Sequence, residues 1–120
     1  MWSKLQEIFD ELEQEYEIPY SRQGSYAEDE ELPTSFYTFW NQNSSFEDYY
    51  SNKPTNCDWE WLIFFYTKDA SMLYTGLEKF IEKALEKGFF VEGKGKDISC
   101  DEPNYSGRYL KVTFEEELTN

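Results

Sequence analysis

The segment from Asp58 to Asp69 constrains the fold more than any other part of the chain. In its first half the large apolar side chains of Trp59, Trp61 and Ile63 alternate with the acidic Asp58 and Glu60. This period of two indicates a β-strand with one wet face. Every residue from Leu62 to Tyr66 is apolar or aromatic, so we expect the far end of the strand to be covered on both faces. The pattern therefore predicts a central strand over residues 58–66.

Two amphipathic helices are expected to cover this strand. Residues 1–16 carry apolar side chains at helical spacing, namely Leu5, Ile8, Phe9, Leu12 and Tyr16. Residues 71–87 carry a second stripe, made of Leu73, Leu77, Phe80, Ile81 and Ala84. Gly88 follows at the position where a helix C-terminus commonly needs a glycine.

The remaining periodic segments predict further strands at residues 18–22, 35–42, 89–91 and 108–118. Their order along the chain favours an α+β fold, with an antiparallel or mixed sheet of four to five strands and two amphipathic helices packed on one face. Residues 1–120 form a single domain in this interpretation. We expect the core between the sheet and the second helix to contain Trp61, Ile63, Phe65, Leu77, Phe80 and Phe114.

Three segments between these elements lack a clear period. Residues 23–32 include the acidic run Glu28, Asp29, Glu30 and Glu31, which indicates a solvated loop. Residues 41–56 hold Phe46, Tyr49 and Tyr50 among polar side chains, and two interpretations stay open. The rings either cap one end of the core or belong to a projecting loop that docks on a neighbouring subunit. Gly93-Lys94-Gly95-Lys96 is read as a hairpin or bulge, because it lacks the spacing of a phosphate-binding Walker motif and precedes no helix.

Charge limits the partners of this protein. The chain has 25 acidic and 11 basic residues, which gives a formal net charge of -14. Binding of nucleic acid or of an anionic membrane needs a basic surface, so both are disfavoured. Aromatic residues make up 20% of the chain, which indicates a packed domain despite the mean hydropathy of -0.81. Charged side chains near the N-terminus replace the apolar stretch of a signal peptide, so we expect the protein to stay in the cytoplasm.

The residues of common catalytic and metal sites are scarce. The chain has no histidine, which removes the most frequent general base and every Ser-His or Cys-His nucleophile system. Asp97, Asp101 and Glu102 lie close together, but such neighbours are expected by chance at this density of acids. Cys57 and Cys100 are isolated, so we expect free thiols. We expect no enzymatic activity, no catalytic residue, no metal and no cofactor.

Several of these patterns together resemble the phage and prophage tail-completion proteins, also called tail terminator or head-tail joining proteins. The resemblance starts at Pro33 and includes Phe36, Tyr37 and Trp40 in the early strand. It continues in the strand ending Leu62-Ile63-Phe64-Phe65-Tyr66-Thr67-Lys68-Asp69 and in the helix with Leu77, Phe80, Ile81 and Leu85. The last strand, Tyr109-Leu110-Lys111-Val112-Thr113-Phe114, completes it. The long segment 41–56 with its extra aromatics departs from the family pattern.

The resemblance implies a structural virion protein that forms a ring, with six subunits as the expected number, at the head-proximal end of a long tail tube. Its partners would be the tail tube protein and the head connector proteins, and assembly would take place in the host cytoplasm. DNA would pass through the ring without specific binding, and no membrane would be involved. Phe46, Tyr49 and Tyr50 are then candidates for a subunit interface, and Glu28, Asp29, Glu30 and Glu31 for an acidic loop facing the lumen.

A second class of function stays open. Small, strongly acidic proteins also act as DNA mimics that occupy the DNA cleft of a nuclease or another DNA-binding protein. A mimic needs its carboxylates in two rows along an elongated surface, whereas here they are spread through helices, loops and the last strand. A small acidic immunity or antitoxin-like partner rests on the same charge argument.

Overall fold

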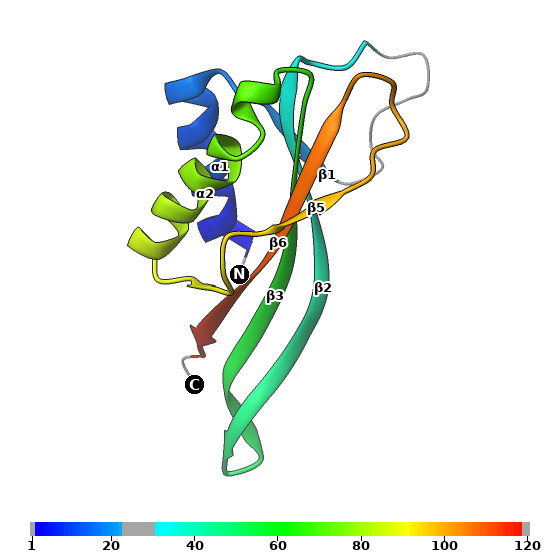
Figure 1. Cartoon of the computed structure of the whole chain (residues 1–120). Helices are drawn as coiled ribbons and strands as arrows, with labels where there is room; N and C mark the ends of the chain where they lie inside the picture. The colour runs from blue at the N-terminus through cyan, green and yellow to red at the C-terminus, as the bar shows by residue number, and fades with distance from the viewer. Residues whose placement is uncertain (1, 23–30, 119–120) are drawn as a thin grey trace.

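The computed structural model describes residues 2–22 and 31–118 and confirms the α+β class (Figure 1). The helices and strands are, in chain order, α1 (Trp2–Tyr16), β1 (Tyr20–Arg22), β2 (Ser35–Tyr50), β3 (Lys53–Thr67), a 3-10 turn (Ala70–Met72), α2 (Thr75–Glu86), β4 (Phe90–Val91), β5 (Lys96–Ile98) and β6 (Ser106–Glu117). The predicted helices and strands are therefore present, with changed bounds and one strand more than expected.

The sheet is mixed and has six strands in the described part of the chain. Its main order is β1-β2-β3-β6-β4, and β5 pairs with β6 beside β4. β1 runs parallel to β2, and all other pairs are antiparallel. β3 lies between β2 and β6, so the prediction of a central strand is confirmed. The expected number of four to five strands was too low, because three residues with no alternating pattern, Lys96 to Ile98, form β5.

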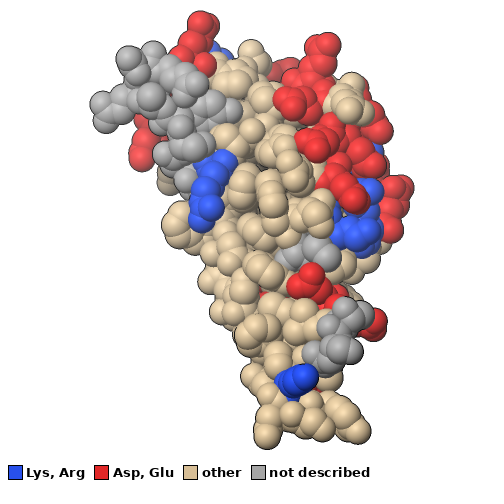
Figure 2. Space-filling view, turned by 180° about the vertical axis from the view of Figure 1, so that it is seen from behind, with Lys and Arg blue, Asp and Glu red and all other residues tan. Residues whose placement is uncertain are grey.

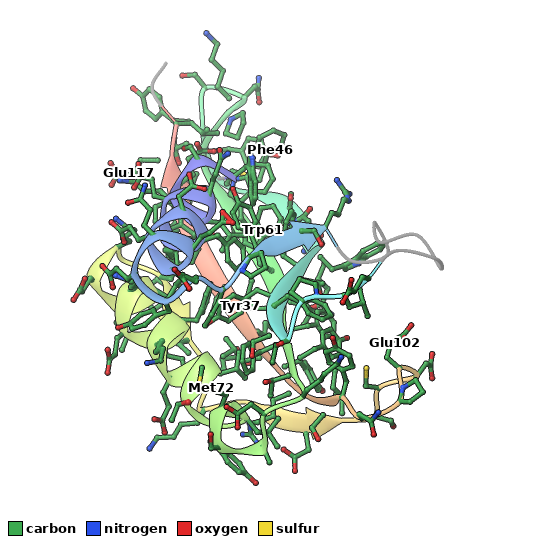
Figure 3. The ribbon with its side chains drawn as sticks, turned by 90° about the horizontal axis from the view of Figure 1, so that it is seen from above. Tyr37, Phe46, Trp61, Met72, Glu102 and Glu117 are labelled. Carbon is green, nitrogen blue, oxygen red and sulfur yellow. The ribbon has the colours of Figure 1, made fainter. Side chains whose placement is uncertain are left out.

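Both helices pack on one face of the sheet, as predicted (Figure 1). Figure 3 shows Tyr37 of β2 between the sheet and the helices. The fully buried side chains on this side include Leu5, Ile8, Phe9 and Leu12 of α1, Leu77, Phe80 and Ala84 of α2, and Ile63 and Phe65 of β3. Five of the six residues predicted for the core are buried, and Phe114 packs against them while only partly buried.

Two details of the helices differ from the sequence prediction. Tyr16 is exposed instead of buried, because its ring lies under the Lys79 ammonium group at 4.0 Å and not against the sheet. The second helix begins at Thr75 and not at Ser71, since the Asp69 carboxylate accepts hydrogen bonds from the Ser71 backbone and hydroxyl and forms a separate 3-10 turn. At its other end Gly88 has a φ of 89° and its N–H donates to the Leu85 carbonyl, so the predicted glycine cap is confirmed.

Among residues 2–22 and 31–118, side chains cover the opposite face of the sheet only at one end. There the Phe36 ring lies tilted against Tyr66, with centroids 5.3 Å apart, and meets Tyr105 edge-on at 5.8 Å. The Tyr105 hydroxyl donates to the Leu32 and Pro33 carbonyls. Leu62 and Phe64 of β3 are only half-buried on this face. The expectation of a strand covered on both faces up to Tyr66 is therefore only partly met.

Candidate functional site

The two longest strands extend past the helices as a hairpin, and this contradicts the prediction of a loop at residues 41–56. β2 and β3 pair from Ser35 opposite Thr67 to Tyr50 opposite Lys53. We call residues 41–57 the projecting hairpin; it forms the lower part of the molecule in Figure 1. The radius of gyration is 15.7 Å, against about 14 Å for a compact domain of this length. The molecule measures 54 × 28 × 25 Å, so it is elongated.

A two-residue turn closes the projecting hairpin. Ser51 and Asn52 connect Tyr50 to Lys53, and both have positive φ angles, 53° and 65°. Two left-handed residues at the centre of a hairpin turn are typical of type I′, which follows the natural twist of the two strands. The sequence did not reveal this turn, because the usual Asn-Gly or Asp-Gly pair is missing and Pro54 argues against a strand. Pro54 is tolerated because β6 ends opposite Asn56, which leaves Pro54 on a strand edge.

A β-bulge lies where the projecting hairpin leaves the rest of the sheet. Asn41 pairs with Trp61, but Asn43 pairs with Glu60, so Gln42 is one residue more than β3 can match. The Asn41 amide bridges this irregularity by donating to the Asn43 and Glu60 carbonyls at 3.2 and 3.1 Å. The Ser44 hydroxyl donates to the same side chain at 3.0 Å. The bulge is therefore held by its own hydrogen bonds.

The bulge changes which β2 side chains share a face with the core. Before it, Tyr37 and Phe39 point to the helices; after it, the register puts Phe46 on that side, opposite Cys57. Tyr50 has the same parity, opposite Lys53, whereas Tyr49 pairs with Pro54 and belongs to the other face. The three predicted interface residues thus lie together along one strand but on two faces of the projecting hairpin.

These three rings are exposed and do not cap the core. Their exposed fractions are 58% for Phe46, 64% for Tyr49 and 76% for Tyr50. The interpretation of core caps is therefore wrong, and the projecting arrangement is the one observed. Trp40 is also exposed, next to the bulge, and was not among the predicted site residues. Its place in the period-two pattern of residues 35–42, opposite the positions of Tyr37 and Phe39, is the signal that could have identified it.

Acidic side chains gather away from the projecting hairpin. Figure 2 shows them over the upper part of the molecule, while the lower part presents mainly uncharged surface. Several acids of α1 are paired with α2: Lys83 lies 3.0 Å from Glu15, and Lys87 lies 3.3 Å from Glu11. Of the predicted acidic loop, Glu28, Asp29 and Glu30 lie outside the described residues, and Glu31 is exposed.

The described residues form no cluster of metal-binding type. Within residues 2–22 and 31–118 no three His, Cys, Asp or Glu side chains are grouped as a metal site requires. Cys57 and Cys100 are both free, and burial together with the nearby Glu116 carboxylate raises the pKa of the Cys57 thiol. None of the described helices has the length and apolarity needed to cross a lipid bilayer.

Comparison with models of known protein families finds no match, and comparison with curated proteins finds none either. Three features distinguish the surface of this chain: an elongated hairpin, a fixed bulge at its base and exposed aromatic rings near its tip.

Proposed function

We propose that this protein is a structural subunit of a phage tail, a tail-completion protein that assembles as a ring at the head-proximal end of the tail tube. The observation that carries the proposal is the projecting hairpin with Phe46, Tyr49 and Tyr50 exposed near its tip. Exposed aromatic anchors on a rigid element are typical of surfaces that become buried between subunits. The resemblance of residues 33–114 to tail terminator proteins supports a position at the head-proximal end of the tail tube.

Backbone geometry supports assembly through the same element. Within the described residues, β1 pairs only with residues 37–39 of β2, so the outer edge of β2 beyond Phe39 has no partner strand there. Unpaired strand edges bind further strands or are protected from doing so by charge or proline. The only charged residues of β2 are Glu47 and Asp48, close to the exposed rings. A neighbouring subunit would cover both the edge and the rings.

The charge of the chain supports a position around DNA in transit. At a formal net charge of -14, a ring of several copies repels phosphates, so the genome would pass without adhering. The acidic surface over α1 and α2 lies away from the projecting hairpin, which leaves the hairpin free of strong like-charge repulsion between copies.

The test is to image tails of the phage or prophage that encodes this chain, and to repeat the experiment with Phe46→Ser combined with Tyr50→Ser. Wild-type tails should carry a closed ring of several copies at one tube end, and the double variant should fold but be missing from the tails. Phe90→Ser is the matched control, because Phe90 is a ring of similar exposure, 64%, that lies on β4 outside the projecting hairpin. Tails that contain one copy of the protein, or none, would contradict the proposal.

A second measurement distinguishes a DNA mimic from the proposed tail subunit. A mimic should displace duplex DNA from a nuclease at submicromolar concentration, since its carboxylates would replace the phosphates. A tail subunit should neither displace the DNA nor bind it at physiological salt. Displacement would favour the mimic and would rule out the tail assignment. Pairing of Glu7, Glu11 and Glu15 with lysines of α2 already removes part of the charge that a mimic would need on α1.

A further inference from the structure

Three lysines gather at one hollow of this otherwise acidic protein. The hollow has a volume of about 430 Å³ and is lined in part by Lys94, Lys96 and Lys111. Leu62 and Tyr109 contribute an apolar floor. Register places Leu62 opposite Lys111, and Lys96 opposite Tyr109, so these four side chains share the face of the sheet that the helices leave open. We call this site the lysine hollow.

One wall of the lysine hollow is held rigidly by Arg108. Its guanidinium group donates to the Gly95 and Lys94 carbonyls at 3.0 and 3.4 Å and pairs with the Asp97 carboxylate. The same group lies over the Tyr74 ring at 4.6 Å. Register explains this arrangement: Asp97 and Arg108 are opposite each other on the helix side, while Lys96 points to the other side. The loop before β5 is therefore fixed from the face opposite to the lysine hollow.

Glycine brings this wall close to the sheet. Gly95 has a φ of +99°, and a Cβ atom at this position would lie 2.8 Å from the Tyr109 carbonyl oxygen. Only glycine combines this backbone angle with this approach. The motif Gly93-Lys94-Gly95-Lys96 was predicted to be a hairpin or bulge. It is not a hairpin, because β4 and β5 both pair with β6 and not with each other; it interrupts the strand edge along β6, as a bulge does. The motif thereby places two lysines at a preformed hollow.

The charges define the class of ligand. The lining contains three lysines against one acid, Glu92, and the Lys111 ammonium group lies 3.4 Å from the Glu60 carboxylate. Lys94 and Lys96 form no ion pair with any residue in the described part of the chain. Lysine ammonium groups act as point charges that bind phosphate or carboxylate groups without requiring a fixed geometry. Because Lys111 is paired with Glu60, the two ammonium groups left for a ligand are those of Lys94 and Lys96, and each can meet one negative charge.

We infer that the lysine hollow binds a small organic dianion, with the charged groups at Lys94 and Lys96 and the organic body against Leu62 and Tyr109. A volume of this size is within the range of small-molecule sites, which combine an apolar lining with a few placed polar groups. Gln42, at the base of the projecting hairpin, is the one lining residue from that segment. The lysines and the apolar floor lie outside it, so the inference does not depend on ring assembly and would hold for a monomer.

The experiment is a titration of the full-length protein with phenyl phosphate at low salt, followed by the backbone amide signals in NMR spectra. Saturable shifts are expected at Gly93, Gly95 and Lys96, with a dissociation constant of about 1 mM for so small a ligand. Inorganic phosphate, which lacks the ring, should bind about tenfold more weakly because it leaves the apolar floor uncovered. Phenol, which lacks the charge, should give no saturable shift at these amides.

Two double variants with equal changes of charge distinguish binding at the lysine hollow from nonspecific electrostatic attraction of the ligand to the protein. Lys94→Gln with Lys96→Gln should weaken binding of phenyl phosphate at least about tenfold. Lys53→Gln with Lys79→Gln, in the hairpin turn and on α2, should leave it within about twofold. Equal weakening in both variants would overturn the inference, and so would shifts that never saturate. An acidic peptide that shifts these amides while phenyl phosphate does not would also overturn it, in favour of a protein docking site.

Discussion

The Tyr37 hydroxyl donates a hydrogen bond of 2.6 Å to the carbonyl oxygen of Gly76. This bond joins the start of β2 to the first turn of α2 inside the core, where both residues are buried. Burial raises the pKa of the Tyr37 hydroxyl well above its ordinary value, so the group stays protonated and remains a donor. The position of α2 on the sheet is thereby fixed at a single point near its start.

Gly76→Ala is expected to destabilise the protein although alanine favours helices. A Cβ atom at residue 76 would lie 2.3 Å from a ring carbon of Phe65, which is fully buried and has no room to turn. Overpacking of this kind costs about 1–3 kcal/mol, which exceeds the gain in helix propensity of about 1 kcal/mol. Urea unfolding measures the difference. A variant as stable as the parent would show that α2 shifts freely on the sheet.

Phe80→Ala should lower the free energy of unfolding by about 3–5 kcal/mol, because it leaves a cavity between α2 and the sheet. Phe80 is fully buried and its ring contacts those of Phe9 and Tyr37. Leu85→Ala on the same helix is the control and should change stability by about 0.5 kcal/mol or less, since Leu85 is exposed. Thermal melts of both variants test this, and equal effects would place α2 elsewhere.

Asn52→Gly should strengthen the projecting hairpin. Asn52 has a φ of 65°, where glycine has no steric cost, and the second central position of a type I′ turn prefers glycine. Relief of the left-handed strain, about 1–2 kcal/mol, exceeds the entropy cost of glycine, about 0.5–1 kcal/mol, so we expect a net gain of about 0.5 kcal/mol. It would be detected as slower hydrogen exchange of the Tyr50 and Lys53 amides. Asn56→Gly is the opposite control: it removes side-chain hydrogen bonds to Asp48 and Glu115 from the middle of a strand and should accelerate exchange.

Lys83 should make the contact between the helices dependent on pH. Its hydrogen bond to Glu15 raises the pKa of the ammonium group, although burial acts against this. A group with a higher pKa in the folded state stabilises that state below its unfolded pKa, which is about 10.4 for lysine. This contribution disappears as the pH rises through the folded value. The difference in stability between the parent and Lys83→Gln should therefore be present at pH 9 and vanish towards pH 12.

The control for this prediction is Lys53→Gln, which removes the same charge in the hairpin turn, away from both helices. Its difference from the parent should not follow the same course with pH. Urea denaturation at each pH provides the numbers for all three proteins. A Lys83→Gln difference that is constant up to pH 12 would show that the pair with Glu15 makes no contribution.

The sequence allowed the core to be predicted because its periods are unbroken there. Trp61, Ile63 and Phe65 alternate, and Leu77 and Phe80 lie at helical spacing, so one burial pattern fits each segment. The α+β class follows from the order of these segments. Such patterns arise from side chains that pack against other parts of the same folded chain, and for this reason they predicted the core residues well.

The projecting hairpin escaped prediction for three physical reasons. Its strands bury little, so polar side chains occupy both faces and no apolar alternation marks them. The extra residue Gln42 reverses the phase of the pattern halfway along β2. Its turn uses Ser51 and Asn52 in place of the glycine-containing pairs that normally signal a hairpin. The candidate rings Phe46, Tyr49 and Tyr50 were found by composition, but their distribution over two faces needed the register.

Gln42 also lies between the part of β2 that packs in the core and the outer part that carries the exposed rings. Because the ladder resumes in register after the bulge, insertion or deletion of one residue at this point would re-aim the whole outer half of the hairpin without moving Tyr37, Phe39 or Trp61. Deletion of Gln42 should give a straighter arm on an unchanged body. At the base of the hairpin, a change in length would therefore redirect the exposed rings of the proposed interface at little risk to folding.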